Sequence, residues 1–251
     1  MFITRKTSNY IFCLFALIFV FIFLLAGCGD DSLSPIKISD FKNDISVKNL
    51  GMRLIDLPYG LNSMESNLDE VEEIFIAVHG GNSEGYEWIY PLKKINTKLR
   101  HMYFYRWPDN NCFQNSAKKL KDEIIQILNE DDSIKKITLI GHSYGGILVT
   151  HLLKNWNLTI PLEIHVVATP LLGTPMLNSI CGYQPISFIP KNSVLYEWRT
   201  QHQLDNVFKD LSEDPQKIEL KESYVTTLPE TYKSNRLGHN WSISWVADEV
   251  F

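Results

Sequence analysis

A serine placed between two glycines is the part of the sequence best suited to chemistry. Residues 141–145 read Gly-His-Ser-Tyr-Gly, which fits the pattern Gly-x-Ser-x-Gly with Ser143 at its centre. The apolar run 137–140 precedes this motif, and the apolar segment 146–153 follows it with helical spacing. A strand, a tight turn and a helix in this order are typical of a serine nucleophile held on a sharp turn. We therefore expect Ser143 to be a nucleophile, the alternative being an ordinary glycine-rich turn.

Strands and helices alternate around this motif. Apolar runs predict strands at 73–80, 102–107, 137–140, 164–168, 194–198 and 224–228. Helical spacing predicts helices at 89–99, 116–129 and 146–154. The alternation implies an α/β fold, a doubly wound and mostly parallel sheet with right-handed crossovers. We also expect one or two edge strands within 45–57. Residues 176–192 have little periodicity and are either a small lid or a plain connection.

Three segments together resemble the α/β-hydrolase family. They are the serine motif, the stretch Thr-Pro-x-x-Gly-x-Pro within 167–175, and the pair Trp107-Pro108 followed by a long helix. The second stretch is similar to one that follows the next strand in many lipases and related esterases. The likeness covers roughly 73–251 and implies an α/β-hydrolase fold with a serine esterase activity that needs no cofactor.

The resemblance also implies the chain order of the catalytic residues, which is serine, then acid, then histidine. His239 follows the last predicted strand, whereas His202 precedes it, so we expect His239 to be the general base. The acid should follow the strand at 194–198. Asp205 resembles the Asp-x-Val signature found there in related hydrolases, and its role would be to orient the imidazole. The other candidates are Asp210, Glu213 and Asp214.

An acyl-transfer site also needs two donors for the oxyanion. One is expected to be the backbone N–H of Tyr144, directly after the nucleophile. The other should come from the loop that follows the first buried strand, His-Gly-Gly-Asn at 79–82. We expect Gly81 to be that donor, with Asn82 next, because glycine permits close approach of the backbone.

The N-terminus has the pattern of an export signal. Arg5 and Lys6 precede an apolar run, 10–26, that has no charge and ends at Leu-Ala-Gly-Cys. This ending resembles the lipobox of bacterial lipoproteins, which implies cleavage before Cys28 and lipidation of its thiol. The expected organisation is a signal at 1–27, a lipidated tether at 28–44 and an α/β-hydrolase domain at 45–251. An uncleaved membrane anchor is the alternative.

Either interpretation places the domain outside the cytoplasm, on a membrane. The residue after Cys28 is Gly29 and not the aspartate associated with inner-membrane retention in enteric lipoproteins, which favours the outer membrane. The chain of 251 residues has a formal net charge of −5, which becomes −7 once a signal holding Arg5 and Lys6 is removed. Binding to nucleic acid through bulk charge is therefore not expected.

Two cysteines remain in the expected mature domain. Cys112 and Cys181 form an even pair in an oxidising compartment, so we expect a disulfide between them, the alternative being two thiols. Each cysteine follows a predicted strand, so both lie at the carboxyl edge of a parallel sheet. Their bond would clamp the loops bordering the site. No motif with metal-ligand spacing is present in the sequence.

The expected function is thus that of a membrane-tethered serine hydrolase acting on carboxylic esters of small molecules or lipids. Two other classes stay open. The same three side chains serve thioesterases, peptidases and acyltransferases, which differ in the acceptor that reaches the acyl-enzyme. A lipoprotein that uses the fold only for binding is the non-enzymatic alternative.

Overall fold

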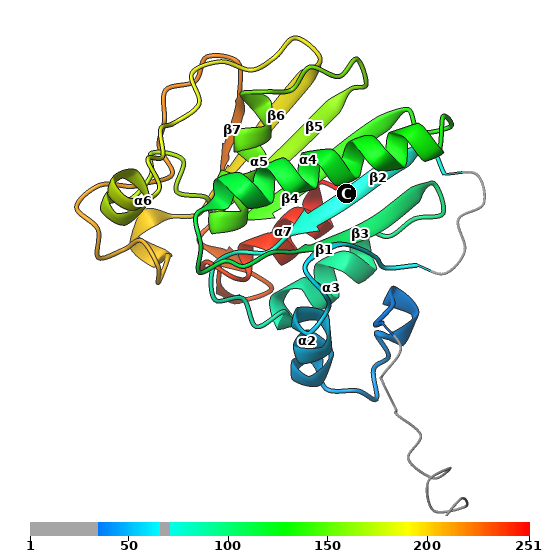
Figure 1. The fold of residues 1–251 in the computed structure, drawn as a ribbon. Coiled ribbons are helices and arrows are strands. Elements are labelled where there is room, and N and C mark those ends of the chain that lie inside the picture. Colours follow the sequence, from blue (N-terminus) through cyan, green and yellow to red (C-terminus); the bar gives the residue numbers. More distant parts are fainter. Residues whose placement is uncertain (1–34, 66–70) are drawn as a thin grey trace, which may run out of the picture. The chain divides into compact units, whose positions relative to one another are not determined.

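The computed structural model describes residues 35–65 and 71–251. At its centre lies a 7-stranded sheet in the order β1-β3-β2-β4-β5-β6-β7 (Figure 1). The strands are β1 (Gly60–Ser63), β2 (Glu73–Val78), β3 (Arg100–Arg106), β4 (Lys136–His142), β5 (Leu162–Val167), β6 (Ser193–Arg199) and β7 (Tyr224–Thr227). Neighbours run parallel except β1, which pairs antiparallel with β3. The expected mostly parallel α/β sheet is confirmed.

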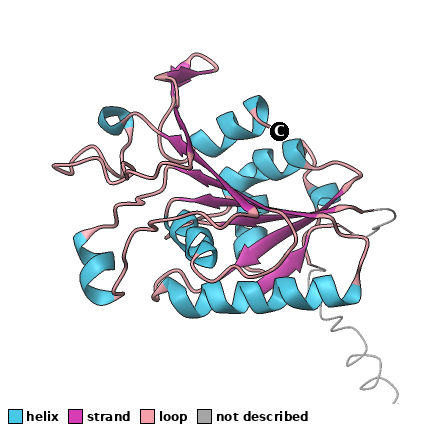
Figure 2. Cartoon of the chain, turned by 90° about the horizontal axis from the view of Figure 1, so that it is seen from above, coloured by secondary structure: helices cyan, strands magenta, loops and turns pink. Residues whose placement is uncertain are grey.

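Helices cover both faces of this sheet (Figure 2). The helices are α2 (Val47–Ile55), α3 (Tyr86–Ile95), α4 (Phe113–Glu130), α5 (Tyr144–Leu153), α6 (Pro175–Ile180) and α7 (Ser242–Glu249). Helices α4 and α5 pack in one core cluster, and α2, α3 and α7 pack in the other. Along β2, Ile74 and Ile76 belong to the first cluster and Phe75 to the second. Because successive side chains of a strand point to opposite faces, such a strand must be apolar throughout.

The prediction of edge strands within 45–57 is wrong, because this segment is helix α2. Leu50 and Leu54, four residues apart, are both buried on one side of the helix. The hydroxyl of Ser46 accepts a hydrogen bond from the backbone N–H of Asn49 at 3.1 Å and caps the helix. The antiparallel edge strand β1 comes directly after this helix, at Gly60–Ser63.

The packed domain begins at Ile36, earlier than the expected start at residue 45. Ile36 and Phe41 are buried in the cluster of α2 and α3, so 36–44 is not a free tether. The backbone N–H of Ile38 donates to the Met64 carbonyl at 2.9 Å, which fixes the segment. The expected signal 1–27 and Cys28 lie outside the described residues. Within the described part of the chain, no helix is long and apolar enough to cross a membrane.

The segment 176–192 contains most of α6 and a return into the core. Tyr183, Ile186 and Ile189 are buried, whereas Met176 and Ile180 are exposed. This anchoring favours a packed connection beside the carboxyl edge of the sheet over a freely opening lid.

Candidate active site

Ser143 lies at a sharp turn between β4 and α5. Its backbone has φ 52° and ψ −121°, a conformation that side-chain-bearing residues rarely adopt. The turn is held by the Ser143 N–H, which donates to the Val167 carbonyl at 2.9 Å. A Cβ on Gly145 would lie 2.4 Å from the carbonyl oxygens of Val78 and His79, so only glycine fits there. The expected strand, turn and helix around the serine are therefore present.

Asp205 and His239 come together although 34 residues separate them. Asp205 follows β6 and a short 3-10 turn at His202–Leu204, and His239 precedes α7. The Nδ1 atom of His239 lies 2.9 Å from Oδ2 of Asp205. Asp205 is fully buried and His239 is 8% exposed. The other acid candidates named from the sequence, including Asp210, make no ion pair with His239.

The carboxylate of Asp205 is stabilised in its charged form. Burial alone would raise its pKa, but hydrogen bonds from His239, Thr200 and the Val207 N–H outweigh burial and hold the pKa below its ordinary value. The Thr200 hydroxyl donates to Oδ2 at 2.6 Å, and the Val207 N–H donates to Oδ1 at 2.8 Å. An ionised, immobile carboxylate keeps the Nδ1–H tautomer of the imidazole and directs Nε2 away from the acid.

The histidine before the nucleophile fixes the loop that carries His239. Nε2 of the buried His142 lies 3.1 Å from the His239 carbonyl, and the two rings have centroids 4.7 Å apart. The Ser242 hydroxyl donates to the same carbonyl at 2.5 Å. Burial lowers the pKa of His142 well below its usual value, so the ring is neutral. The sequence suggested only packing for His142. Its contact with His239 joins the sharp turn at 141–145, called the elbow below, to the expected base.

The hydroxyl of Ser143 forms no hydrogen bond with the His239 imidazole in the described residues. Catalytic hydrogen bonds are often long or misaligned without substrate and tighten in the complex. The structure thus unites Asp205 with His239 and joins the His239 loop to the elbow of Ser143 through His142.

The Gly-Gly loop lies against the nucleophile, where an oxyanion would form. A Cβ on Gly80 would be 3.0 Å from Cβ of Ser143, and one on Gly81 would be 3.8 Å from the Tyr144 ring. The N–H of Asn82 already donates to Oδ2 of Asp109 at 2.5 Å. Because Asn82 is thus engaged, Gly81 is the better second donor. Tyr144 is the first residue of α5, where backbone N–H groups have no partner within the helix.

Hydrogen bonds of His79 hold the Gly-Gly loop in place. Its Nδ1 donates to the Gly80 carbonyl at 2.8 Å, and its Nε2 accepts from Arg106 at 2.7 Å. The Trp107 indole donates to the His79 carbonyl at 2.9 Å. Burial, with the Arg106 charge adding to it, lowers the pKa of His79 to about 4, so the ring is neutral at pH 7. The roles of His79, Arg106 and Asp109 were missed from the sequence, although His79 begins the motif and Asp109 follows Trp107-Pro108.

Cys112 and Cys181 form a disulfide, as expected, with an S–S distance of 2.03 Å. Cys112 precedes α4 and Cys181 ends α6, so the bond joins two loops at the carboxyl edge of the sheet. The Tyr144 hydroxyl lies 3.9 Å from Sγ of Cys181, which places the disulfide beside the residue after the nucleophile.

Loss of the disulfide should lower the free energy of unfolding, with a smaller effect on the rate of catalysis. Replacing Cys112 and Cys181 together by serine opens a loop with a sequence separation of 69, and we expect a loss of about 2–4 kcal/mol. That loss corresponds to a melting temperature lower by about 5–15 °C. Differential scanning calorimetry measures the shift. Reaction of both thiols with iodoacetamide in folded, non-reduced protein would contradict the bond.

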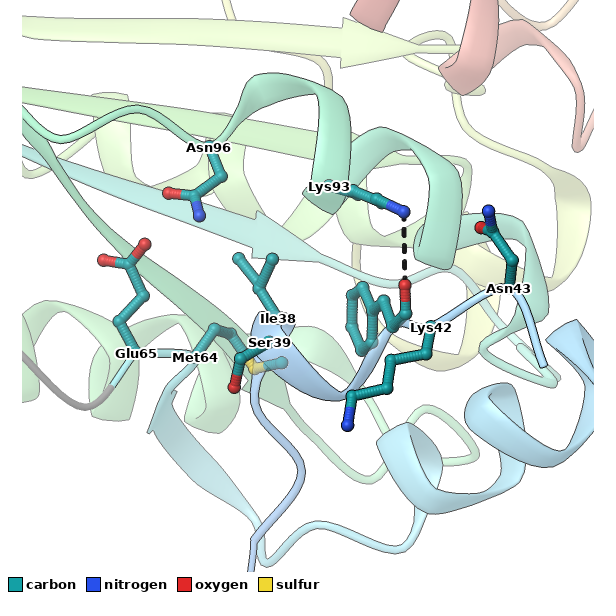
Figure 3. A pocket seen from close by; sticks show the side chains of 9 residues that line it. Ile38, Ser39, Lys42, Asn43, Met64, Glu65, Lys93 and Asn96 are labelled. Atoms are coloured by element: carbon teal, nitrogen blue, oxygen red, sulfur yellow. Dashed lines mark hydrogen bonds between the residues drawn. The ribbon is translucent and has the colours of Figure 1, made fainter. Parts of the chain in front are cut away.

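A cavity of about 720 Å³ lies between the segment 38–43, the residues that follow β1 and the last turn of α3 (Figure 3). The Nζ atom of Lys93 donates to the Phe41 carbonyl at 3.3 Å, and the dashed line from Lys93 in Figure 3 marks a hydrogen bond. The cavity is lined by Ile38, Ser39, Phe41, Lys42, Asn43, Met64, Glu65, Lys93 and Asn96. None of them belongs to the elbow, the Gly-Gly loop or the Asp205–His239 pair, so this cavity is not the substrate site of Ser143. Within 35–65 and 71–251, no cluster of three or more potential ligands could hold a metal ion.

The part of the chain that carries Ser143 matches a known protein family. Residues 69–203 match the family described as "Putative serine esterase (DUF676)". The chain belongs to this family. The match includes Gly81, Ser143 and Tyr144, but it ends before Asp205 and His239. The assignment of the acid and the base therefore rests on their position and their hydrogen bond. No curated protein matches the chain.

Solved structures of hydrolases share the fold. The esterase Est1E from Butyrivibrio proteoclasticus superposes with a TM-score of 0.51 at 14% identity, covering 75% of this chain and 88% of that one. A "putative thioesterase" from Silicibacter sp. TM1040 has a TM-score of 0.51 at 17% identity, covering 82% of this chain and 87% of that one. At such identities the likeness establishes the α/β-hydrolase fold and not the substrate.

Proposed function

We propose that the protein hydrolyses carboxylic esters through an acyl-enzyme on Ser143. The observation that carries the proposal is the buried Asp205–His239 hydrogen bond, joined through His142 to a serine at a strained turn. Membership in the serine esterase family supports the same chemistry. The proposal needs no cofactor.

The reaction would proceed in two halves. His239 takes the hydroxyl proton as Ser143 attacks the ester carbonyl, and the backbone N–H groups of Gly81 and Tyr144 stabilise the oxyanion. Collapse breaks the bond to the alcohol oxygen, which receives that proton from His239. Water, deprotonated by His239, then attacks the acyl-enzyme. The bond from the acyl carbon to the Ser143 oxygen breaks, this oxygen takes the proton back from His239, and the carboxylic acid leaves. Asp205 stabilises the imidazolium in both halves without taking its proton.

A panel of p-nitrophenyl esters of increasing acyl length tests this function. We expect hydrolysis at rates far above buffer, and the change of kcat/KM with acyl length reports how much of the acyl chain the site accommodates. A thioester of equal acyl length, followed with a thiol reagent, separates esterase from thioesterase. Folded protein that turns over neither substrate would contradict the proposal.

We also propose that the domain is tethered to a membrane by lipid on Cys28 and faces the periplasm or the exterior, with the outer membrane favoured. The support is the sequence pattern that ends at Leu-Ala-Gly-Cys. Stable anchoring takes more than one acyl chain, which lipoprotein processing supplies. Labelled palmitate should be incorporated into the unmodified protein, and Cys28→Ser should abolish that label. An unmodified protein that takes up no label and keeps residues 1–27 would support the uncleaved anchor instead.

A further inference from the structure

A second cavity, of about 310 Å³, is lined in part by Asn240 and Trp241, the two residues that directly follow the proposed base His239. Small-molecule sites begin at about this size. Its walls come from α2, from the first turns of α3 and from the start of α7. They are Val47, Tyr86, Glu87, Tyr90, Asn240, Trp241 and Ser244.

The cavity is placed so that the alcohol part of an ester, which is the leaving group, could extend into it. Asn240 and Trp241 directly follow His239, and Tyr86 begins α3 just after the Gly-Gly loop. The Asn240 amide donates to the Tyr86 hydroxyl at 3.3 Å, which ties the two walls together. The alcohol of an ester must lie next to His239, because His239 supplies its proton. A group attached to that alcohol can therefore reach this cavity.

One wall of the cavity holds a carboxylate that no cation of the described chain neutralises. Glu87 is 8% exposed, and within 35–65 and 71–251 it forms no ion pair. Its Oε1 accepts from the Ser83 hydroxyl, but Oε2 has no hydrogen-bond partner. Burial raises the pKa of Glu87, as expected for a buried carboxylate without a counter-ion, so a cation in the cavity would be attracted to its ionised form.

The other walls are aromatic and half exposed. Tyr86, Tyr90 and Trp241 have 39%, 41% and 39% of their surface accessible. Aromatic faces attract ammonium groups, and the attraction grows when a carboxylate lies near. The structure already contains one such contact, because Nζ of Lys233 lies 4.6 Å from the ring centroid of Tyr90. Lys233 also pairs with Asp248 at 2.8 Å, so its charge is already balanced.

We infer that this cavity binds a quaternary or primary ammonium group carried on the alcohol part of the substrate. The inference rests on the proposed esterase function and names its substrate class, esters of amino alcohols. Hydrolysis breaks the acyl C–O bond. The amino alcohol leaves with the proton from His239, and water completes the carboxylic acid.

Paired substrates test the inference. Butyrylcholine and 3,3-dimethylbutyl butyrate have the same shape and differ in charge. We expect kcat/KM to be about 10-fold or more higher for the cationic ester, and Glu87→Gln to remove most of that preference. Because the ratio is taken within each variant, a general loss of activity cancels. Glu84→Gln removes the same charge from a neighbouring exposed position and should leave the ratio unchanged. Equal rates for the two esters in the unmodified protein, or an unchanged ratio in Glu87→Gln, would overturn the inference.

A binding measurement separates this inference from the esterase proposal. Tetramethylammonium should bind to Ser143→Ala protein in calorimetry, and Glu87→Gln added to that variant should weaken binding about 10-fold. Binding without ester turnover in the unmodified protein would leave the cation site standing while the esterase proposal fails. No binding by the Ser143→Ala protein would overturn the site even if p-nitrophenyl esters are hydrolysed.

Discussion

Replacing Ser143 by alanine should lower kcat for p-nitrophenyl butyrate by about 10⁴- to 10⁶-fold. Without the hydroxyl no acyl-enzyme forms, and only the oxyanion donors and substrate binding remain to assist direct attack by water. The change removes one oxygen atom from a half-buried side chain. The melting temperature should therefore stay within a few degrees, and steady-state kinetics with a folded variant measures the effect.

A matched control for that substitution is Ser179→Ala. Ser179 is an exposed serine on α6, at the same edge of the sheet, whose hydroxyl donates to the Pro175 carbonyl at 2.7 Å. Its loss should leave kcat within about twofold. If Ser143→Ala retained a tenth of the activity, the nucleophile would have to be another residue.

Replacing Asp205 by asparagine should lower kcat by about 10⁴-fold. The asparagine amide can keep a hydrogen bond to Nδ1 of His239, but it favours the wrong tautomer and leaves the imidazolium without a counter-charge. Stability should fall as well, because Thr200 and the Val207 N–H now donate to the aspartate. Kinetics near neutral pH, with circular dichroism as the check on folding, measures both effects.

Asp210→Asn is the control for this substitution. Asp210 is exposed, lies on the same loop after β6 and forms no ion pair in the described part of the chain. Its loss of charge should leave kcat nearly unchanged. Full activity of Asp205→Asn, or a large loss in Asp210→Asn, would refute the assignment of the acid.

The sheet and the elbow were predictable because their physics is local. Parallel strands buried on two faces are largely apolar, and the runs between 73 and 199 became such strands near their expected bounds. The run at 224–228 became the exposed edge strand β7. The glycines of the elbow follow from backbone crowding alone. Asp205 and His239 were found from chain order, and the structure brings them within 2.9 Å.

The wrong prediction concerned a short segment, and the missed residues make contacts between segments that are far apart in the chain. The apolar residues of 45–57 fit a strand as well as a helix until the spacing of Leu50 and Leu54 is given more weight than β-branched content. The support of the oxyanion loop by His79 and Asp109 depends on where loops meet after folding. No spacing along the chain predicts such contacts, and the same holds for Glu87 beside Trp241.

Labelling with a fluorophosphonate, followed by peptide mapping, tests the central claim most directly. The reagent reacts with a serine only when a base and oxyanion donors activate it. The tryptic peptide 137–154 contains Ser143 as its sole serine. We predict stoichiometric labelling of this peptide in the unmodified protein and none in Ser143→Ala. Folded protein that stays unlabelled, or a label on another peptide, would contradict the account.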